Sequence, residues 1–215
     1  MNFDAIIFDL DGTLVDSAPG ILHSMAQALR DGGQTPAQPL DTRLIGPPLG
    51  ATLARLCPQA DAATLADLTA AFKRDYDHSG YQQSPPYPGV QALLLSLQAR
   101  AMPCLIATNK RLLPTTHIVQ QHAWAALFDG VYAPDSLQPS ATSKGDLLHH
   151  VLARHGLAPA RTLYVGDRWE DALAARQAGM PFFFANWGYA DGPLPEPVAL
   201  QGTLADLQRL LDGGP

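Results

Sequence analysis

Two aspartates, Asp9 and Asp11, stand directly after the apolar run Ala5–Phe8, and Gly12 follows them. We expect the chain to bend after Leu10, because glycine adopts backbone conformations that other residues avoid. Two carboxylates on one turn repel each other, and a cation or a proton must offset that repulsion. Oxygen-only ligands suit a hard cation such as Mg²⁺. The segment therefore predicts a site for a cation or a proton at the end of a strand.

Three more polar clusters lie after apolar runs or at the start of helical stretches. They are Thr108-Asn109-Lys110, Lys144, and the segment from Gly166 to Asp171. Ligands of an open α/β sheet bind beyond the carboxyl ends of its strands, so these clusters are expected near one site. Each cluster alone has a plainer explanation: a strand-ending turn, a surface lysine, or acids at a helix N-terminus. Their occurrence together favours one shared site.

Short apolar runs alternate with amphipathic stretches over most of the chain. This pattern predicts an α/β fold with a Rossmann-like, doubly wound parallel sheet covered by helices on both sides. The predicted strands are Ala5–Phe8, Cys104–Ala107, Val131–Ala133, Thr162–Val165 and Phe182–Ala185. The helices predicted around them are Val90–Arg100, Thr115–Ala126, Lys144–His155, Glu170–Ala178 and Leu204–Leu211.

The stretch from Asp16 to Ser84 breaks this alternation, because it contains helical patterns and no strand-like run. Its predicted helices are Ala18–Arg30, Leu49–Cys57 and Ala62–Asp77. A proline-rich segment after Ser84 is typical of a stiff hinge. We therefore expect a core domain of residues 1–15 and 85–215, with an inserted helical domain of residues 16–84.

Composition and charge argue against several classes of protein. The 14 basic and 20 acidic residues give a net charge of −6, which is unlike a general nucleic-acid-binding protein. Cys57 and Cys104 form no disulfide framework and no zinc-binding pattern, so we expect a cytoplasmic protein. We also expect no secretory signal and no membrane-spanning segment, because the apolar runs are short and no basic leader precedes one.

The four polar clusters, taken in order, resemble the four motifs of the haloacid dehalogenase superfamily of phosphohydrolases. The resemblance runs from Phe3 to about Trp187 and is most specific in DLDGTLVDS at residues 9–17 and GDxxxD at residues 166–171. It implies that the insertion is a small helical cap of the C1 type. Within the superfamily, the chain is most similar to phosphoglycolate phosphatases, through residues 44–49, 87–90 and 108–110.

The resemblance implies a division of labour among the motif residues. Asp9 would be the nucleophile that forms an aspartyl-phosphate. Asp11 would be the general acid and then the general base, and its presence favours phosphate over halide chemistry. Thr108, Asn109 and Lys144 would bind the phosphoryl group.

The same resemblance implies a magnesium site. Asp9, the backbone carbonyl of Asp11, and Asp167 would hold Mg²⁺, with Asp171 beside them. Further candidates for contact with the substrate are Gly12, Arg43 and Lys110.

These expectations combine into a Mg²⁺-dependent phosphatase that acts on a small phosphorylated metabolite, as a monomer or homodimer. Phosphoglycolate is a candidate substrate, although Lys144 is followed by Gly145-Asp146, where many phosphoglycolate phosphatases have prolines. The sequence assigns no role to Arg168-Trp169-Glu170. Two alternatives share the motifs: a phosphomutase of the β-phosphoglucomutase type, and a non-catalytic regulatory or binding protein on the same fold.

Overall fold

The computed structural model describes residues 3–190, 196 and 198–213 of the chain. At its centre is a six-stranded sheet with the order β3-β2-β1-β4-β5-β6, in which all paired strands are parallel. The predicted α/β fold with a Rossmann-like parallel sheet is therefore confirmed. The strands are β1 (Ala5–Phe8), β2 (Cys104–Ala107), β3 (Gly130–Tyr132), β4 (Thr162–Gly166), β5 (Phe182–Ala185) and β6 (Leu200–Gly202).

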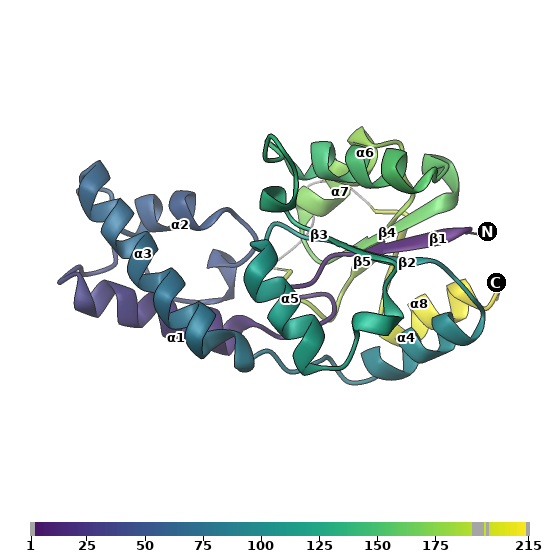
Figure 1. The fold of residues 1–215 in the computed structure, drawn as a ribbon, viewed down its shortest axis with the longest axis horizontal. Coiled ribbons are helices and arrows are strands. Elements are labelled where there is room, and N and C mark those ends of the chain that lie inside the picture. Colours follow the sequence, from purple (N-terminus) through teal and green to yellow (C-terminus); the bar gives the residue numbers. More distant parts are fainter. Residues whose placement is uncertain (1–2, 191–195, 197, 214–215) are drawn as a thin grey trace.

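Helices cover both faces of this sheet (Figure 1). Side chains alternate along a strand, so Ile6 and Phe8 of β1 face one layer of helices and Ile7 faces the other. Burial on both faces explains why the strands are apolar throughout. The first layer consists of α4 (Val90–Ala99), α5 (Leu112–Gln121) and α8 (Leu204–Leu211), and the second of α6 (Lys144–His155) and α7 (Trp169–Gln177).

The elements between β1 and α4 are all helices, and they lie beyond one end of the sheet (Figure 1); we call this part of the chain the insertion. Its helices bury an apolar cluster of their own, which includes Leu53, Leu56 and Leu68. They are α1 (Ala18–Asp31), α2 (Leu49–Leu56) and α3 (Ala62–His78), with short 3₁₀ helices at Thr42–Leu44 and Gly80–Gln82.

The two connections between the insertion and the core run side by side. The backbone N–H of Asp16 donates to the carbonyl oxygen of Pro85 at 2.9 Å, and that of Tyr87 donates to Leu14 at 3.1 Å. An isolated antiparallel bridge joins Val15 to Pro86. These bonds hold the entry and the exit of the insertion together next to Asp11, so the insertion leaves the core beside the strand ends.

Two elements differ from the sequence predictions by more than one residue at an end. Helix α5 spans Leu112–Gln121 instead of residues 115–126. It includes Pro114 because a proline in the first turn removes no helical hydrogen bond, and it ends before Ala123, whose φ of 56° is left-handed. The sequence does not predict β6, because the three residues 200–202 are too few to show a strand period. Further 3₁₀ helices occupy Ala125–Leu127, Pro134–Ser136 and Pro159–Arg161.

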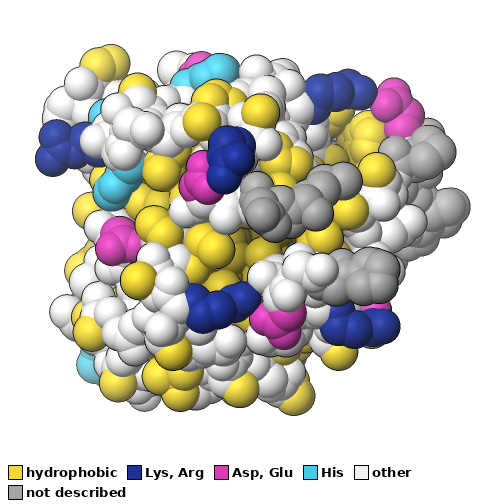
Figure 2. Space-filling model, turned by 90° about the vertical axis from the view of Figure 1, so that its right-hand side faces the viewer, with side chains coloured by type: hydrophobic (Ala, Val, Ile, Leu, Met, Phe, Trp, Pro, Cys, Tyr) yellow, Lys and Arg dark blue, Asp and Glu magenta, His cyan; other side chains and the backbone are white. Residues whose placement is uncertain are grey.

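The surface at the end of the core away from the insertion carries charges of both signs (Figure 2). On this face, the basic side chains of the described residues lie apart from one another, and several adjoin an acidic side chain. A nucleic-acid-binding face would gather its basic side chains instead. Within the described ranges, no helix is both long enough and apolar enough to cross a membrane.

Candidate active site

Three adjacent strands bring the first site residues to one edge of the sheet. Strand β1 lies between β2 and β4, and all three are parallel. Asp9 follows β1, Thr108 follows β2 and Asp167 follows β4. Because parallel strands end at the same edge, residues that are far apart in the sequence meet there.

The two carboxylate oxygens of Asp9 differ in their contacts. Oδ2 lies 3.0 Å from Nζ of Lys144. Oδ1 is buried and has no hydrogen-bond partner among the described residues. Burial raises the pKa of Asp9 to about 6, although the charge of Lys144 opposes this shift. A buried oxygen without a partner is unfavourable, so Oδ1 is an atom that a bound ligand would satisfy.

Lys144 is the first residue of α6, and it bridges two acids. Its Nζ lies 3.0 Å from Asp9 Oδ2 and 2.7 Å from Asp171 Oδ1. Ser143 caps the helix, because its Oγ accepts a hydrogen bond from the backbone N–H of Asp146. The cap fixes the first turn of α6, and with it the position of Lys144. Burial alone would lower the pKa of Lys144, but Asp171 and Asp9 raise it above its usual value. The lysine therefore remains charged inside the site.

Asp167 is buried beside these groups. Its Oδ2 accepts a hydrogen bond of 2.7 Å from the backbone N–H of Tyr189, and its Oδ1 accepts one of 3.3 Å from Thr13 Oγ1. Burial, followed by the charges of Asp171 and Asp9, raises the pKa of Asp167 to about 8. Oxygens of the three acids lie within 4.8 Å of one another. This all-oxygen donor set, whose repulsion Lys144 offsets only in part, fits a hard divalent cation.

Asp171, like Asp167 and unlike Asp9, has a partner for each of its carboxylate oxygens. Oδ1 accepts from Lys144 at 2.7 Å and from the Tyr164 hydroxyl at 3.3 Å. Oδ2 accepts from the backbone N–H of Arg168 at 3.1 Å. These contacts hold Asp171 in place, so it can orient Lys144 as well as contribute charge to the cluster.

Two glycines allow the backbone to approach Asp167 closely. Gly12 has φ +79°, and a Cβ there would lie 2.2 Å from Asp167 Oδ2. A Cβ on Gly188 would lie 2.2 Å from the carbonyl oxygen of Gly12 and 2.3 Å from Asp167 Cβ. The turn after β1 and the loop after β5 therefore pack against Asp167 only because both positions lack a side chain.

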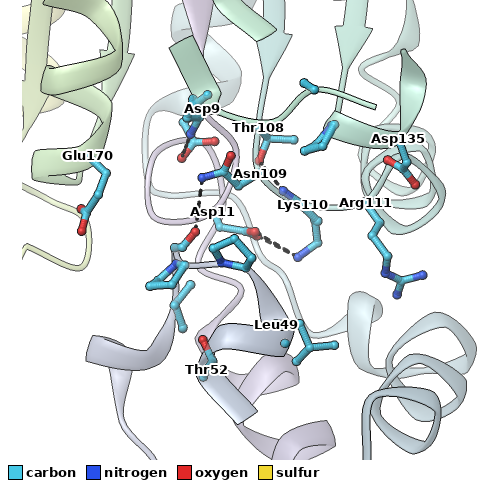
Figure 3. Close-up of a pocket in the computed structure, with 18 of the residues that line it drawn as sticks. Asp9, Asp11, Leu49, Thr52, Thr108, Asn109, Lys110, Arg111, Asp135 and Glu170 are labelled. Atoms are coloured by element: carbon cyan, nitrogen blue, oxygen red, sulfur yellow. Dashed lines mark hydrogen bonds and ion pairs between the residues drawn. The ribbon is translucent and has the colours of Figure 1, made fainter. Parts of the chain in front are cut away.

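Asp11 forms an ion pair with Lys110. Nζ lies 3.0 Å from Oδ1 and 3.1 Å from Oδ2, as the dashed line in Figure 3 shows. The same Nζ lies 4.5 Å from the ring centroid of Tyr76, which belongs to α3 of the insertion. Burial alone would lower the pKa of Lys110, but Asp11 and Tyr76 raise it above its usual value. The lysine therefore links a strand-end acid to the insertion.

Thr108 and Asn109 lie beside Asp9 and face the cavity (Figure 3). The Oγ1 of Thr108 accepts a hydrogen bond of 3.2 Å from the backbone N–H of Lys110. The hydroxyl can still donate, as a phosphoryl oxygen requires. Asn109 Nδ2 donates to the carbonyl oxygen of Gly46 at 3.4 Å, so its amide contacts the insertion.

Two arginines are placed differently from each other. Arg43 pairs with Asp41 at 2.5 Å, its side chain is 61% exposed, and the described cavity lining does not include it. Arg168 instead donates through Nη2 to the carbonyl oxygens of Thr42 at 2.5 Å and Ile45 at 2.6 Å. Arg168 thus binds the insertion to the loop that carries Asp167, a contact that the sequence does not predict.

A cavity of about 700 Å³ lies between the strand ends and the insertion. Figure 3 shows the core residues on one side of it and the insertion residues Leu49 and Thr52 on the other. The predicted site residues in its lining are Asp9, Asp11, Thr108, Asn109, Lys110 and Lys144. Asp167 and Asp171 stand directly behind Asp9 and Lys144, so the structure gathers these predicted residues into one place.

Comparisons with known proteins identify a family for the chain. The model of a family described as haloacid dehalogenase-like hydrolase matches residues 6–185. A phosphoglycolate phosphatase of Photobacterium profundum is 32% identical over 219 residues, which cover 96% of this chain and 93% of the relative.

Other relatives carry a different name. The tyrosine-protein kinase PtkA of Mycobacterium tuberculosis is 35% identical over 185 residues, or 86% of this chain. This match spans only 62% of the relative's length. The solved structure of the M. tuberculosis protein has a TM-score of 0.82 and 29% identity, and the match covers 98% of each chain.

Proposed function

This chain belongs to the haloacid dehalogenase-like hydrolases, and from that premise we propose that it is a Mg²⁺-dependent phosphatase of small phosphomonoesters. The observation that carries the proposal is the environment of Asp9. Its Oδ1 is buried and unpartnered within the described part of the chain, while Lys144 neutralises Oδ2. A nucleophile needs such an available oxygen, and the adjoining cavity gives it access to a substrate.

The acid cluster supports the magnesium requirement. Asp9 and Asp167 would hold the ion together with the backbone carbonyl of Asp11. The neighbouring Asp171 would add negative charge to the site. When bound, Mg²⁺ neutralises charge on the phosphoryl oxygens. Burial raises the pKa of Asp9 and of Asp167, and neighbouring carboxylates add to both shifts, so a bound cation would relieve this repulsion.

The first half-reaction uses Asp9 as the nucleophile. Its Oδ1 forms a bond to phosphorus as the ester P–O bond breaks, and the leaving oxygen takes a proton from Asp11. Lys144 and the Thr108 hydroxyl offset the negative charge of the phosphoryl oxygens. The products are an aspartyl-phosphate on Asp9 and a free alcohol.

The second half-reaction returns the enzyme to its starting state. Asp11, now ionised, takes a proton from a water molecule, whose oxygen attacks phosphorus. The bond between phosphorus and the Asp9 oxygen breaks, and inorganic phosphate leaves. Lys110 supports this step by position, because its Nζ lies 3.0 Å from Asp11 Oδ1 and holds the carboxylate in place.

The direct test is hydrolysis of p-nitrophenyl phosphate with and without Mg²⁺. We expect phosphate release that requires the metal and that Asp9→Asn reduces by at least about a thousandfold. Asp4→Asn is the matched control, because Asp4 lies on the exposed surface and pairs with Arg161. Full activity of the Asp9→Asn variant would show that Asp9 is not the nucleophile.

A second candidate function follows from the relatives that are named tyrosine-protein kinases. In that case a tyrosine hydroxyl, rather than water, would receive a phosphoryl group. Incubation with ATP and a tyrosine-containing peptide distinguishes the two, since a phosphatase transfers nothing to the peptide. Hexose 1-phosphates, scored for isomerised product, test the phosphomutase alternative in the same series.

A further inference from the structure

The cavity has two chemically different halves. Its core half contains the side chains of Asp9, Asp11, Thr108 and Lys144. Its insertion half presents apolar side chains from α1, α2, α3 and the loop between α1 and α2, among them Ile21, Met25, Leu44, Pro47, Leu49 and Phe72. At about 700 Å³ the cavity has the size of a site for a drug-sized ligand, far larger than a two-carbon acid phosphate requires.

The cations of this cavity are almost all neutralised. Among the described residues, its lining contains four: Lys73, Lys110, Arg111 and Lys144. Lys144 and Lys110 form the ion pairs with the catalytic-site acids already given. Arg111 donates to both carboxylate oxygens of Asp77, at 2.9 and 2.5 Å. Only Lys73 of these four has no such pair to break before it could bind a carboxylate of a substrate.

The insertion half also contains two stacked and almost fully buried aromatic side chains of α3, Phe72 and Tyr76, which we call the α3 wall. Phe72 and Tyr76 lie one turn apart on α3, with ring centroids 5.4 Å apart and an interplanar angle of 8°. Both residues line the cavity. Tyr76 also touches Lys110, the partner of Asp11. The wall therefore begins where the proposed general acid stands, and it extends from there into the insertion.

The position of Asp11 decides which half receives the leaving group. In the proposed reaction Asp11 protonates the leaving oxygen, so the rest of the alcohol lies on the Asp11 side of the phosphate. Figure 3 shows Asp11 between Asp9 and the insertion residues Leu49 and Thr52. The alcohol would therefore extend toward the apolar half, where a carboxylate would lose its hydration without gaining a free cation next to Asp11.

We propose that the substrate is a phosphomonoester of an apolar, ring-bearing alcohol, whose ring packs against Ile21, Leu49 and the α3 wall. This inference rests on the proposed phosphatase function and specifies its substrate class. Apolar burial and ring stacking supply the binding energy for the leaving group. An acidic leaving group such as glycolate gains neither.

Three alkyl esters test the proposal: benzyl phosphate, ethyl phosphate and phosphoglycolate. Their leaving alcohols differ little in acidity, so intrinsic reactivity does not determine the ranking. With Mg²⁺ present, we expect kcat/KM for benzyl phosphate to exceed that for phosphoglycolate by roughly a hundredfold. We expect it to exceed that for ethyl phosphate by about tenfold, because ethanol buries less apolar surface.

Two cavity variants locate the effect. Leu49→Ser and Ile21→Ser each replace a half-buried apolar side chain of the lining, and each should lower the benzyl-to-ethyl ratio of kcat/KM by about threefold. Leu113→Ser is the matched control: Leu113 is 50% exposed on α5 and lies outside the described lining, so the ratio should stay unchanged. The comparison of substrates on the wild-type protein stands even if one variant fails to fold.

The outcomes separate this proposal from the function on which it rests. Equal kcat/KM for the three esters, all dependent on Asp9, would overturn the substrate class and leave the phosphatase function intact. A preference for phosphoglycolate that Lys73→Gln removes would also overturn it, because Lys73 would then bind the carboxylate. Lack of turnover of all three esters and of p-nitrophenyl phosphate would reject the phosphatase function and this proposal together.

Discussion

Lys110 binds both carboxylate oxygens of Asp11, at 3.0 and 3.1 Å, while its ammonium group rests on the ring of Tyr76. The pair is nearly closed to solvent, with side-chain exposures of 6% for Lys110 and 14% for Asp11. A buried charge that loses its partner is costly, so neither group is expected to move independently of the other. The proposed acid–base residue is therefore positioned by a residue that also touches the insertion.

Removal of this lysine should damage catalysis more than binding. Lys110→Met leaves Asp11 without its partner, and we expect kcat for p-nitrophenyl phosphate to fall between about tenfold and a hundredfold, with a smaller change in KM. Lys110→Arg keeps a cation and should recover part of the loss. Steady-state kinetics of both variants check the prediction, and an unchanged kcat in Lys110→Met would contradict it.

Arg168 should control how firmly the insertion is held against the core. Its guanidinium donates to two carbonyl oxygens of the segment that ends at Ile45, and such charge-assisted bonds are each worth about 1.5–3 kcal/mol. In Arg168→Met we expect faster amide hydrogen exchange in residues 42–46 and a KM raised about tenfold. Arg161→Met, which removes an exposed pair with Asp4, serves as the control. Unchanged exchange in residues 42–46 would disprove this role.

The Arg168 contacts show where sequence analysis reaches its limit. Strand periodicity and the polar residues after each strand predict the sheet and the common site, because both depend on short-range patterns. Arg168 binds backbone carbonyls 123 and 126 positions away in the chain. Every residue has a carbonyl, so the acceptor has no sequence signature, and its position depends on how the insertion docks. The motif that contains Arg168 predicts where a helix begins, but it does not predict which carbonyl groups Arg168 binds.

Tyr189 illustrates the same limit at the acid cluster. Its backbone N–H donates to Asp167, while its hydroxyl donates to Asp16 and accepts from the backbone N–H of Ala18. A lone tyrosine in a loop gives no indication of this bridge between the cluster and the entry to the insertion. The only available signal is its place shortly after β5, at the carboxyl edge of the sheet, where site residues gather.

Magnesium should stabilise the protein, and more so at higher pH. The pKa values of about 6 for Asp9 and about 8 for Asp167 exceed the ordinary value of 3.8. The metal-free folded chain therefore holds protons that the unfolded chain releases, so its stability falls as pH rises from about 4 to 8. Protons compete with Mg²⁺ for these oxygens, so the metal-induced rise in Tm should be larger at pH 8 than at pH 6.

Thermal unfolding with Mg²⁺ or EDTA measures this effect, and Asp167→Asn provides the matched variant. The substitution removes a buried charge, so the metal-free variant should melt above the metal-free wild type at pH 8. It should also lose most of its response to Mg²⁺. An equal response to Mg²⁺ in variant and wild type would show that Asp167 is not a ligand.

Gly188 should be as important to the acid cluster as the acids themselves. In Gly188→Ala the new methyl group would lie 2.2 Å from the Gly12 carbonyl oxygen and 2.3 Å from Asp167 Cβ, so the loop or the acid must move. We expect a loss of about 1–3 kcal/mol in the free energy of unfolding and a weaker thermal response to Mg²⁺. Gly50→Ala meets nothing within 4 Å and should change stability by less than about 1 kcal/mol. Because both variants add one methyl group, a difference between them in the Mg²⁺ response reports the displacement of Asp167, and equal behaviour would refute the close packing at Gly188.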